Sequence, residues 1–205
     1  MLFVQFIFFV LLKTKLFMPG FLSADRQAVS KKKLNMKQVL FSAVLFLSLV
    51  ACGQQDKSKR PSPPAKAEAT LSNGTVVSVD YSQPSVKGRT IGKDLEPMEG
   101  NVWRAGANEA TVFEVSKNVK VEDKDLPAGK YGLFTIMNGD EWTIIFSKTW
   151  NQWGDFSYKE ADDALRVKVK AAKADPFAEK LTYTVGKDGK VTLLWGDRKV
   201  EFKVK

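Results

Sequence analysis

Polar, charged and aromatic side chains that suit ligand recognition gather in one irregular stretch of the sequence. Arginine offers a planar fork of donors that fits a carboxylate or a phosphate, and Asn and Glu add a donor and acceptors. We therefore expect a pocket for a carboxylate, a phosphate or a sugar, with Glu109 as an acceptor. The candidate residues are Lys87, Arg89, Trp103, Arg104, Asn108 and Glu109.

The same stretch also has a structural interpretation. Arg104 and Glu109 are expected to form a buried ion pair that locks an irregular loop onto the domain, because buried backbone groups in such loops need side-chain partners. The two interpretations differ in whether these side chains line an open cleft or are sealed against the rest of the protein.

A second group of candidates consists of aromatic residues in a short polar segment. Trp150 and Trp153 flank Asn151 and Gln152, and Trp142 and Tyr158 lie nearby in the sequence. Flat aromatic faces beside amide donors suit the stacking of sugar rings. Aromatic residues also serve as core or loop-anchoring groups, and this alternative stays open.

The composition excludes several kinds of chemistry. The chain has no histidine and only one cysteine, Cys52, so catalytic arrangements that use a histidine base are absent. Neither a zinc nor a copper site is expected, and no Asp-x-Asp-x-Asp-Gly calcium loop occurs, so we predict no metal and no cofactor. An enzyme would have to pair Glu109 with Asp155 or Asp140, as in glycoside hydrolysis.

The N-terminal region has the features of an export signal. Met36 and Lys37 precede an apolar run that ends in Leu-Val-Ala-Cys52, which resembles the lipobox of bacterial lipoproteins. We predict that residues 1–51 are a leader and that Cys52 becomes acylated. Residues 1–35 are either an over-long gene start, with translation beginning at Met36, or part of one long leader.

The segment after the cysteine is polar and rich in proline. We therefore predict that residues 52–70 form a flexible, lipidated tether. Gly53 is not the aspartate that retains lipoproteins in the inner membrane, so an outer-membrane anchor is expected, with the domain facing the periplasm or the cell surface.

The excess of positive charge belongs mainly to the leader. Seven of the 32 basic residues precede Cys52, together with one of the 23 acidic residues, which leaves a net charge of only +3 beyond it. Basic residues are typical of export signals, so we predict no nucleic-acid partner.

Residues 71–205 show the alternation that is typical of β-strands. Turn sequences separate the segments, such as residues 138–140, 187–189 and 196–197. We predict an all-β, antiparallel β-sandwich of jelly-roll or immunoglobulin-like kind, with one short helix at most, near Tyr158–Leu165. The expected strands are Thr75–Tyr81, Thr111–Val115, Val119–Glu122, Lys130–Met137, Glu141–Ser147, Leu165–Lys170, Lys180–Val185, Val191–Trp195 and Val200–Val204.

Several motifs resemble those of the DUF2911 family, a set of uncharacterised domains common in Bacteroidetes. They include Tyr-Ser-x-Pro-Ser-Val-Lys-Gly-Arg at 81–89, Val-Trp-Arg-x-Gly-Ala-Asn-Glu-Ala-Thr at 102–111 and Leu-Pro-Ala-Gly-x-Tyr-x-Leu-Phe-Thr-Ile at 126–136. Glu-Trp-Thr-Ile-Ile-Phe at 141–146 and Gln-Trp-Gly at 152–154 complete the set. The resemblance strengthens the expectation of one domain and implies no activity.

Together, these features predict an envelope lipoprotein without catalytic activity. Its domain is expected to bind a small molecule, a glycan or an envelope partner through the stretch that carries Arg104, Asn108 and Glu109. The alternative is a hydrolase that acts on envelope or dietary polymers, with Glu109 as its acid/base.

Overall fold

The computed structural model describes residues 56–205, so the predicted leader and Cys52 lie outside the described residues. The helices of the described part are two short 3-10 turns, η1 (Lys57–Lys59) and η2 (Glu160–Asp162). The segment expected to form a short helix near Tyr158–Leu165 contains only η2, and strand β9 (Asp163–Lys170) follows it directly. Over residues 56–205, no helix has both the length and the apolar character needed to cross a membrane.

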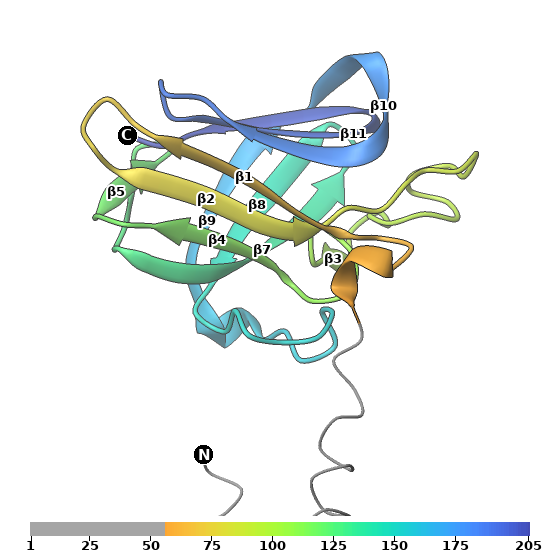
Figure 1. The fold of residues 1–205 in the computed structure, drawn as a ribbon, viewed down its shortest axis with the longest axis horizontal. Helices are drawn as coiled ribbons and strands as arrows, with labels where there is room; N and C mark the ends of the chain where they lie inside the picture. The colour runs from red at the N-terminus through yellow and green to blue at the C-terminus, as the bar shows by residue number, and fades with distance from the viewer. Residues whose placement is uncertain (1–55) are drawn as a thin grey trace, which may run out of the picture. The chain divides into compact units, whose positions relative to one another are not determined.

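An antiparallel sheet of seven strands forms the larger layer of the fold. Its main path runs β1-β2-β4-β7-β8-β9, and the short β3 pairs with β7 beside that path. Strands along the path follow chain order, so this sheet is a meander (Figure 1). Besides β9, its members are β1 (Pro64–Thr70), β2 (Val76–Ser82), β3 (Val102–Trp103), β4 (Thr111–Val115), β7 (Gly129–Asn138) and β8 (Glu141–Ser147).

A long hairpin of β10 (Ala172–Val185) and β11 (Lys190–Lys203) forms the second layer. It lies over one face of the larger sheet (Figure 1). A small hairpin of β5 (Val119–Val121) and β6 (Lys124–Leu126) closes one end, where Val121 bridges to Val204. The prediction of an all-β antiparallel sandwich is therefore confirmed.

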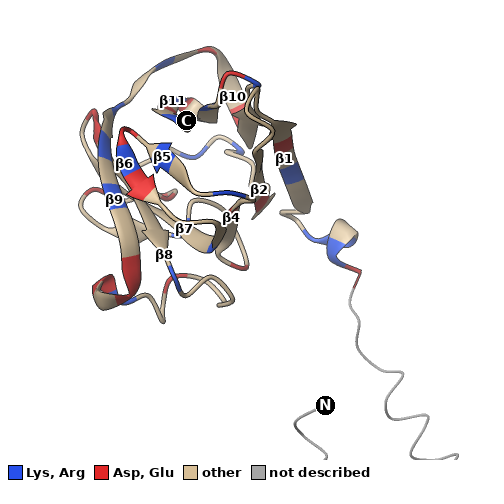
Figure 2. Cartoon of the chain, turned by 90° about the vertical axis from the view of Figure 1, so that its left-hand side faces the viewer, with Lys and Arg blue, Asp and Glu red and all other residues tan. Residues whose placement is uncertain are grey.

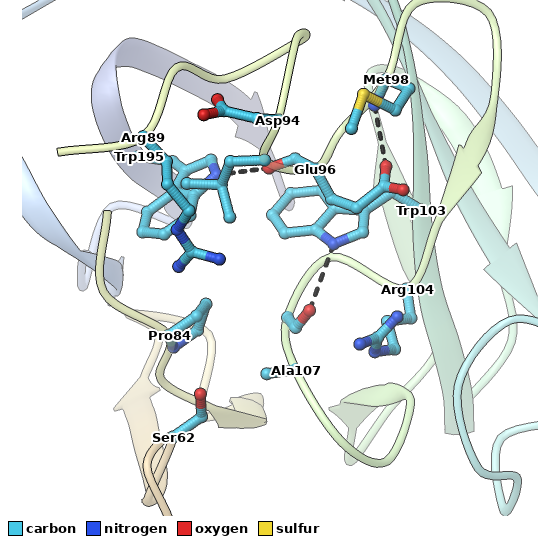
Figure 3. A pocket seen from close by; sticks show the side chains of 12 residues that line it. Ser62, Pro84, Arg89, Asp94, Glu96, Met98, Trp103, Arg104, Ala107 and Trp195 are labelled. Carbon is cyan, nitrogen blue, oxygen red and sulfur yellow. Dashed lines mark hydrogen bonds between the residues drawn. The ribbon is translucent and has the colours of Figure 1, made fainter. Parts of the chain in front are cut away.

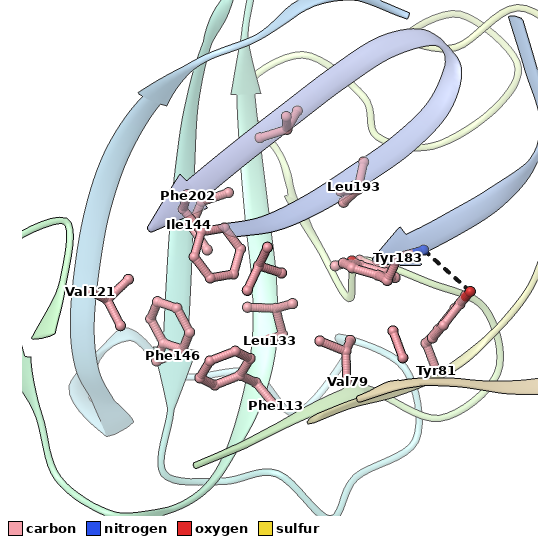
Figure 4. Packing of buried hydrophobic residues seen from close by; sticks show 14 of the residues in the cluster. Val79, Tyr81, Phe113, Val121, Leu133, Ile144, Phe146, Tyr183, Leu193 and Phe202 are labelled. Carbon is pink, nitrogen blue, oxygen red and sulfur yellow. Dashed lines mark hydrogen bonds between the residues drawn. The ribbon is translucent and has the colours of Figure 1, made fainter. Parts of the chain in front are cut away.

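Aromatic side chains fill the space between the layers (Figure 4). The ring of Phe146 meets those of Phe113 and Phe202 at centroid distances of 5.0 and 5.8 Å, both in edge-on geometry. The three residues come from β8, β4 and β11, so this cluster ties the two layers together. Alternation explains their burial, since every second residue of a half-buried strand points inward.

The predicted strands Thr111–Val115 and Glu141–Ser147 match β4 and β8 at both ends. The turn expected at Gly196-Asp197 does not form, because β11 continues through it. Gly196 takes a left-handed φ of 59°, and the register of the β10–β11 ladder shifts between Ala178 and Thr182. The glycine therefore accommodates an irregularity within a long strand instead of a chain reversal.

The domain begins earlier than the predicted tether boundary at residue 70. Strand β1 pairs with β2 from Pro64↔Ser82 to Thr70↔Val76. The prolines suggested an extended linker, but Pro64 is the first residue of an edge strand, a position that tolerates proline. Beyond it, small alanines alternate with charged residues, which is a strand pattern.

Replacing Phe146 with Ala is expected to lower the free energy of unfolding by about 3–5 kcal/mol, because it opens a cavity in the aromatic cluster. Urea unfolding followed by circular dichroism measures the change. The matched control is Phe156→Ala, since Phe156 is solvent-exposed and should cost no more than about 0.5 kcal/mol. Equal losses in the two variants would contradict this account of the core.

Candidate functional site

The 102–111 motif forms a large excursion from the edge of β7. Strands β3 and β4 pair with the same edge, through Trp103↔Thr135 and Thr111↔Leu133. Only Phe134 lies between these two partners on β7, so residues 104–110 leave the sheet as a loop. The amide of Thr111 closes this loop by donating to the carbonyl of Arg104 at 3.3 Å.

A buried carbonyl at Ala105 holds the loop in place. It accepts hydrogen bonds from the hydroxyls of Thr111 and Tyr183, both at 2.9 Å. Ala105 has a left-handed φ of 53°, which turns its carbonyl toward these donors. The next residue, Gly106, has no space for a side chain, since an added Cβ would lie 2.6 Å from Thr111 Oγ1.

Asn108 forms hydrogen bonds that connect the loop to two other segments of the chain. Its side-chain amide donates to the carbonyl of Ser62 at 3.0 Å, and its own carbonyl accepts from the amide of Gly154 at 3.0 Å. A left-handed φ of 59° allows both contacts, and Asn is among the residues that tolerate this conformation. Asn108 therefore has a structural role that joins the N-terminal segment to the loop after β8.

Glu109 does not pair with Arg104, so the predicted ion pair is wrong. Arg60 Nη1 donates to both carboxylate oxygens of Glu109 at 3.0 Å, and Lys57 Nζ lies 2.9 Å from one of them. Arg104 instead faces Asp155 at 3.7 Å. The positive φ angles of Ala105 and Asn108 bend the loop between the two residues and place their side chains beside different neighbours.

The surroundings of Glu109 stabilise its ionised form. Burial alone would raise its pKa, but hydrogen bonds from Lys57 and Arg60 outweigh that effect and lower the pKa to about 2. The carboxylate is therefore charged at neutral pH. A general acid needs a pKa near the working pH, so this environment does not suit proton donation by Glu109.

A pocket with a volume of about 390 Å³ opens on the other side of the loop (Figure 3). Three of the predicted site residues line it: Arg89, Trp103 and Arg104. The walls also contain residues that the sequence analysis did not select, among them Asp94, Glu96, Met98 and Trp195.

The two arginines bring positive charge to this pocket. Arg89 donates from Nε to the carbonyl of Val86 at 3.0 Å and from Nη2 to that of Ser85 at 2.6 Å, which fixes its guanidinium. Arg104 is 25% exposed, and its ion-pair distance of 3.7 Å is too long for a hydrogen bond. Its Nε is buried without a hydrogen-bond partner among the described residues. The charge of Arg104 is thus only loosely compensated.

The remaining walls are apolar surface and carboxylates. The indole N–H groups of Trp103 and Trp195 donate to the carbonyls of Gly106 and Glu96, at 3.1 and 2.8 Å. Both indole N–H groups are therefore occupied, and the two rings, at most 1% exposed, pack behind the pocket surface. Asp94 accepts from the amide of Thr90, and Glu96 accepts from the amide of Met98. Each carboxylate keeps acceptor capacity for hydroxyl or amino groups of a ligand.

The other predicted site residues lie outside this pocket. Lys87 is exposed, and its amide donates to Glu179 Oε1. Trp150 and Trp153 are partly exposed in the loop after β8, where Lys130 and Arg60 lie over their rings at 5.5 and 5.9 Å.

Asp140, considered above for a carboxylate pair, and the acidic residues Asp123 and Asp125 have basic partners. Asp140 pairs with Arg198, and Asp123 and Asp125 pair with Lys205 and Lys120. Within residues 56–205, no three His, Cys, Asp or Glu residues are grouped so that they could hold a metal ion.

The missed residue Trp195 shows the limit of local sequence reasoning. Strand β11 brings it to the pocket from a position far along the chain, and nothing next to it in the sequence marks a site. Asp94 and Glu96 carried a weak signal, because they lie in the irregular stretch between Arg89 and Trp103.

Replacing Glu109 with Gln tests the ion pairs of this loop. The folded-state pKa of about 2 lies below the ordinary value of 4.5, so ionised Glu109 contributes stability in full above about pH 4.5 and loses it as the pH falls toward 2. The side chain is 37% exposed, and solvent screening limits the contribution to about 1 kcal/mol. We expect the variant to be less stable at pH 7, and the difference to shrink below about pH 4.5 and to vanish near pH 2.

Urea unfolding of both proteins across this pH range measures the difference. The control is Glu114→Gln, which removes an exposed pair with Lys130 and should change the stability at pH 7 by less than about 0.5 kcal/mol. A difference for Glu109→Gln that stays constant from pH 7 to pH 2 would refute the electrostatic role of Glu109.

Comparisons with known proteins place the domain in a family. The model of DUF2911, described as a protein of unknown function, matches residues 62–204, which includes β1 and the β10–β11 hairpin. No curated protein and no solved structure matches the chain. The match covers more than half of the sequence and nearly all of the described domain, so the chain belongs to the DUF2911 family.

Proposed function

We propose that this protein is a non-catalytic binding protein of the bacterial envelope, tethered to the outer membrane through Cys52. The pocket beside the 104–110 loop takes a small polar molecule that carries an anionic group. The observation that carries the proposal is the presence of two guanidinium groups, Arg89 and Arg104, in the lining of one pocket, with Arg104 only loosely compensated. Arginine is well suited to bidentate recognition of a carboxylate or a phosphate.

The surrounding groups narrow the class of ligand. Asp94 and Glu96 suit hydroxyl or amino groups, while the partly buried side chain of Met98 adds apolar surface to the lining. A sugar acid or another small hydroxylated carboxylate combines these features. The pocket volume of about 390 Å³ lies in the usual range for small-molecule sites.

The hydrolase alternative has less support. Glu109 lies in a separate depression with Lys57 and Arg60, which hold its carboxylate in ion pairs. Neither acid proposed as its partner is free in the described structure, since Asp155 faces Arg104 and Asp140 faces Arg198.

The proposal of a membrane tether is based on the segment that ends in Leu-Val-Ala-Cys52. Its basic start, apolar run and small residues before the cysteine are typical of a lipoprotein signal. A diacylglycerol on the cysteine would keep the mature protein on a membrane without any spanning helix.

Ligand binding is tested by a thermal-shift screen of residues 56–205 with glucuronate, citrate, inorganic phosphate and uncharged glucose. A ligand at 100 times its dissociation constant stabilises the folded state by about 2.7 kcal/mol, or about 5–10 °C for a domain of this size. We expect a shift with an anionic compound, a smaller one in Arg104→Lys, and none in Arg104→Gln.

The control variant is Lys168→Gln, which removes an exposed charge on β9 outside the pocket and should keep the full shift. An equal shift with glucose and the anions, or a full shift in a folded Arg104→Gln variant, would overturn the proposed site.

The tether is tested by Cys52→Ala in a bacterial host that acylates lipoproteins. We expect the wild-type protein to incorporate a labelled fatty acid and to sediment with the outer membrane. The variant should lose the label, since the cysteine is the acylation site. An unlabelled wild-type protein would refute the anchor.

A further inference from the structure

We propose that the end of the domain formed by η1 and residues 150–156 docks on the bilayer surface, so that the lipid anchor is not its only membrane contact. This inference rests on the proposed acylation of Cys52. Both segments lie at the same end of the described domain (Figure 1).

The segment after Cys52 is too short to hold the domain far from the membrane. Residues Lys57 and Arg60 are fixed to Glu109 by ion pairs, and Glu109 forms a β-bridge with Trp153. Only four peptide units join Cys52 to Asp56, which spans at most about 14 Å of extended chain. An acylated Cys52 therefore keeps Asp56, where η1 begins, within about that distance of the attached lipid, and the contacts of Glu109 hold the 150–156 loop next to η1.

Exposed aromatic residues occupy this end of the domain. Phe156 is 86% exposed and Trp153 is 58% exposed, although the other large aromatic residues of the fold are mostly buried. Exposing such side chains to water is unfavourable, and tryptophan prefers the boundary between water and lipid, where its ring and its N–H are both accommodated. These two side chains suit insertion among headgroups.

The charges at this end favour an anionic surface. Lys57 and Lys59 are exposed on η1, where Figure 2 shows blue segments next to the start of the described chain. Lys57 pairs with Glu109 and Lys59 lies 4.0 Å from Asp56, so together with Arg60 these basic residues exceed their two acidic partners by one charge. A net positive charge close to an anionic bilayer is attracted to it. The acidic residues of the loop after β8 are partly neutralised, since Asp155 faces Arg104 and Glu160 faces Arg166.

The acyl anchor already binds the protein to the membrane, so the docking contact would determine how the domain is oriented on the bilayer. It would hold the end of the domain that carries η1 and residues 150–156 against the lipid. The test must therefore report the depth of particular side chains rather than membrane binding alone.

Quenching by brominated acyl chains provides this readout. The acylated full-length protein is reconstituted into vesicles of phosphatidylethanolamine and phosphatidylglycerol with brominated chains, and tryptophan fluorescence is recorded. Three of the five tryptophans, Trp103, Trp142 and Trp195, are buried, so lipid quenching reports on Trp150 and Trp153. We expect clear quenching, which should fall at least twofold in the variant Phe156→Ser with Lys59→Gln.

The matched control is Phe177→Ser. Phe177 is 57% exposed on β10, away from η1 and the 150–156 loop, so its replacement should leave quenching unchanged. Melting temperatures within a few degrees of the wild type would establish that each variant is folded.

The outcomes separate the docking from the anchor. An acylated protein that floats with the vesicles but shows no quenching overturns the docking and leaves the anchor intact. Equal quenching in the wild type and the Phe156→Ser/Lys59→Gln variant also overturns it. A wild-type protein that proves to carry no acyl chains and does not bind the vesicles overturns both the anchor and the docking. A change in tryptophan fluorescence on addition of glycan fragments, without quenching by brominated lipid, would overturn the docking and indicate that Trp153 stacks on sugars.

Discussion

The carbonyl of Ala105 is the group on which the irregular half of the domain depends. It is buried and accepts from one hydroxyl of the larger sheet, Thr111, and from one of the opposite layer, Tyr183. A net contribution of about 1 kcal/mol for each bond is modest, but an unsatisfied buried carbonyl would cost more. Tyr183 also packs edge-on against Tyr81 of β2 at 4.8 Å, so the same contact joins loop, hairpin and sheet.

The two sides of the 104–110 loop serve different parts of the molecule. One side supplies Arg104, Gly106 and Ala107 to the pocket. The other side supplies Asn108 and Glu109, which hold the N-terminal segment and the loop after β8. A change in the position of this loop would therefore affect both the pocket and the end of the domain that we assign to the membrane surface.

The regular part of this fold was readable from the sequence because burial imposes a period of two. Residues 111–115 and 141–147 show that period between clear turn residues, and both strands have the predicted bounds. Strand β1 was missed because Pro64 and the small alanines carry little hydrophobic signal, although pairing with β2 satisfies the backbone of the strand. The wrong prediction of a turn at Gly196 has a related cause. A glycine at a register shift within a strand cannot be distinguished by sequence from a glycine in a turn.

The candidate site was only partly readable, because its geometry depends on left-handed residues and on distant strands. Arg104 and Glu109 seemed suitable partners by spacing, but the bends at Ala105 and Asn108 direct them to Asp155 and Arg60. The prediction of a flexible tether at residues 52–70 implies no fixed contacts there, so the sequence does not predict the ion pairs of Glu109 with Lys57 and Arg60.

The division of roles within the loop explains why Arg104, rather than Glu109, suits ligand recognition. Glu109 has its charge balanced by two cations, so a ligand would have to displace Lys57 or Arg60 to reach it. Arg104 has one distant counter-ion, Asp155 at 3.7 Å, and lines a pocket that also contains Arg89, Asp94 and Glu96, so a ligand can reach it without displacing a close ion pair. The chain contains no histidine, and arginine stays charged at all physiological pH values. The proposed recognition of an anion in this pocket therefore depends on where the loop geometry places Arg104, because the charge of the guanidinium is always present.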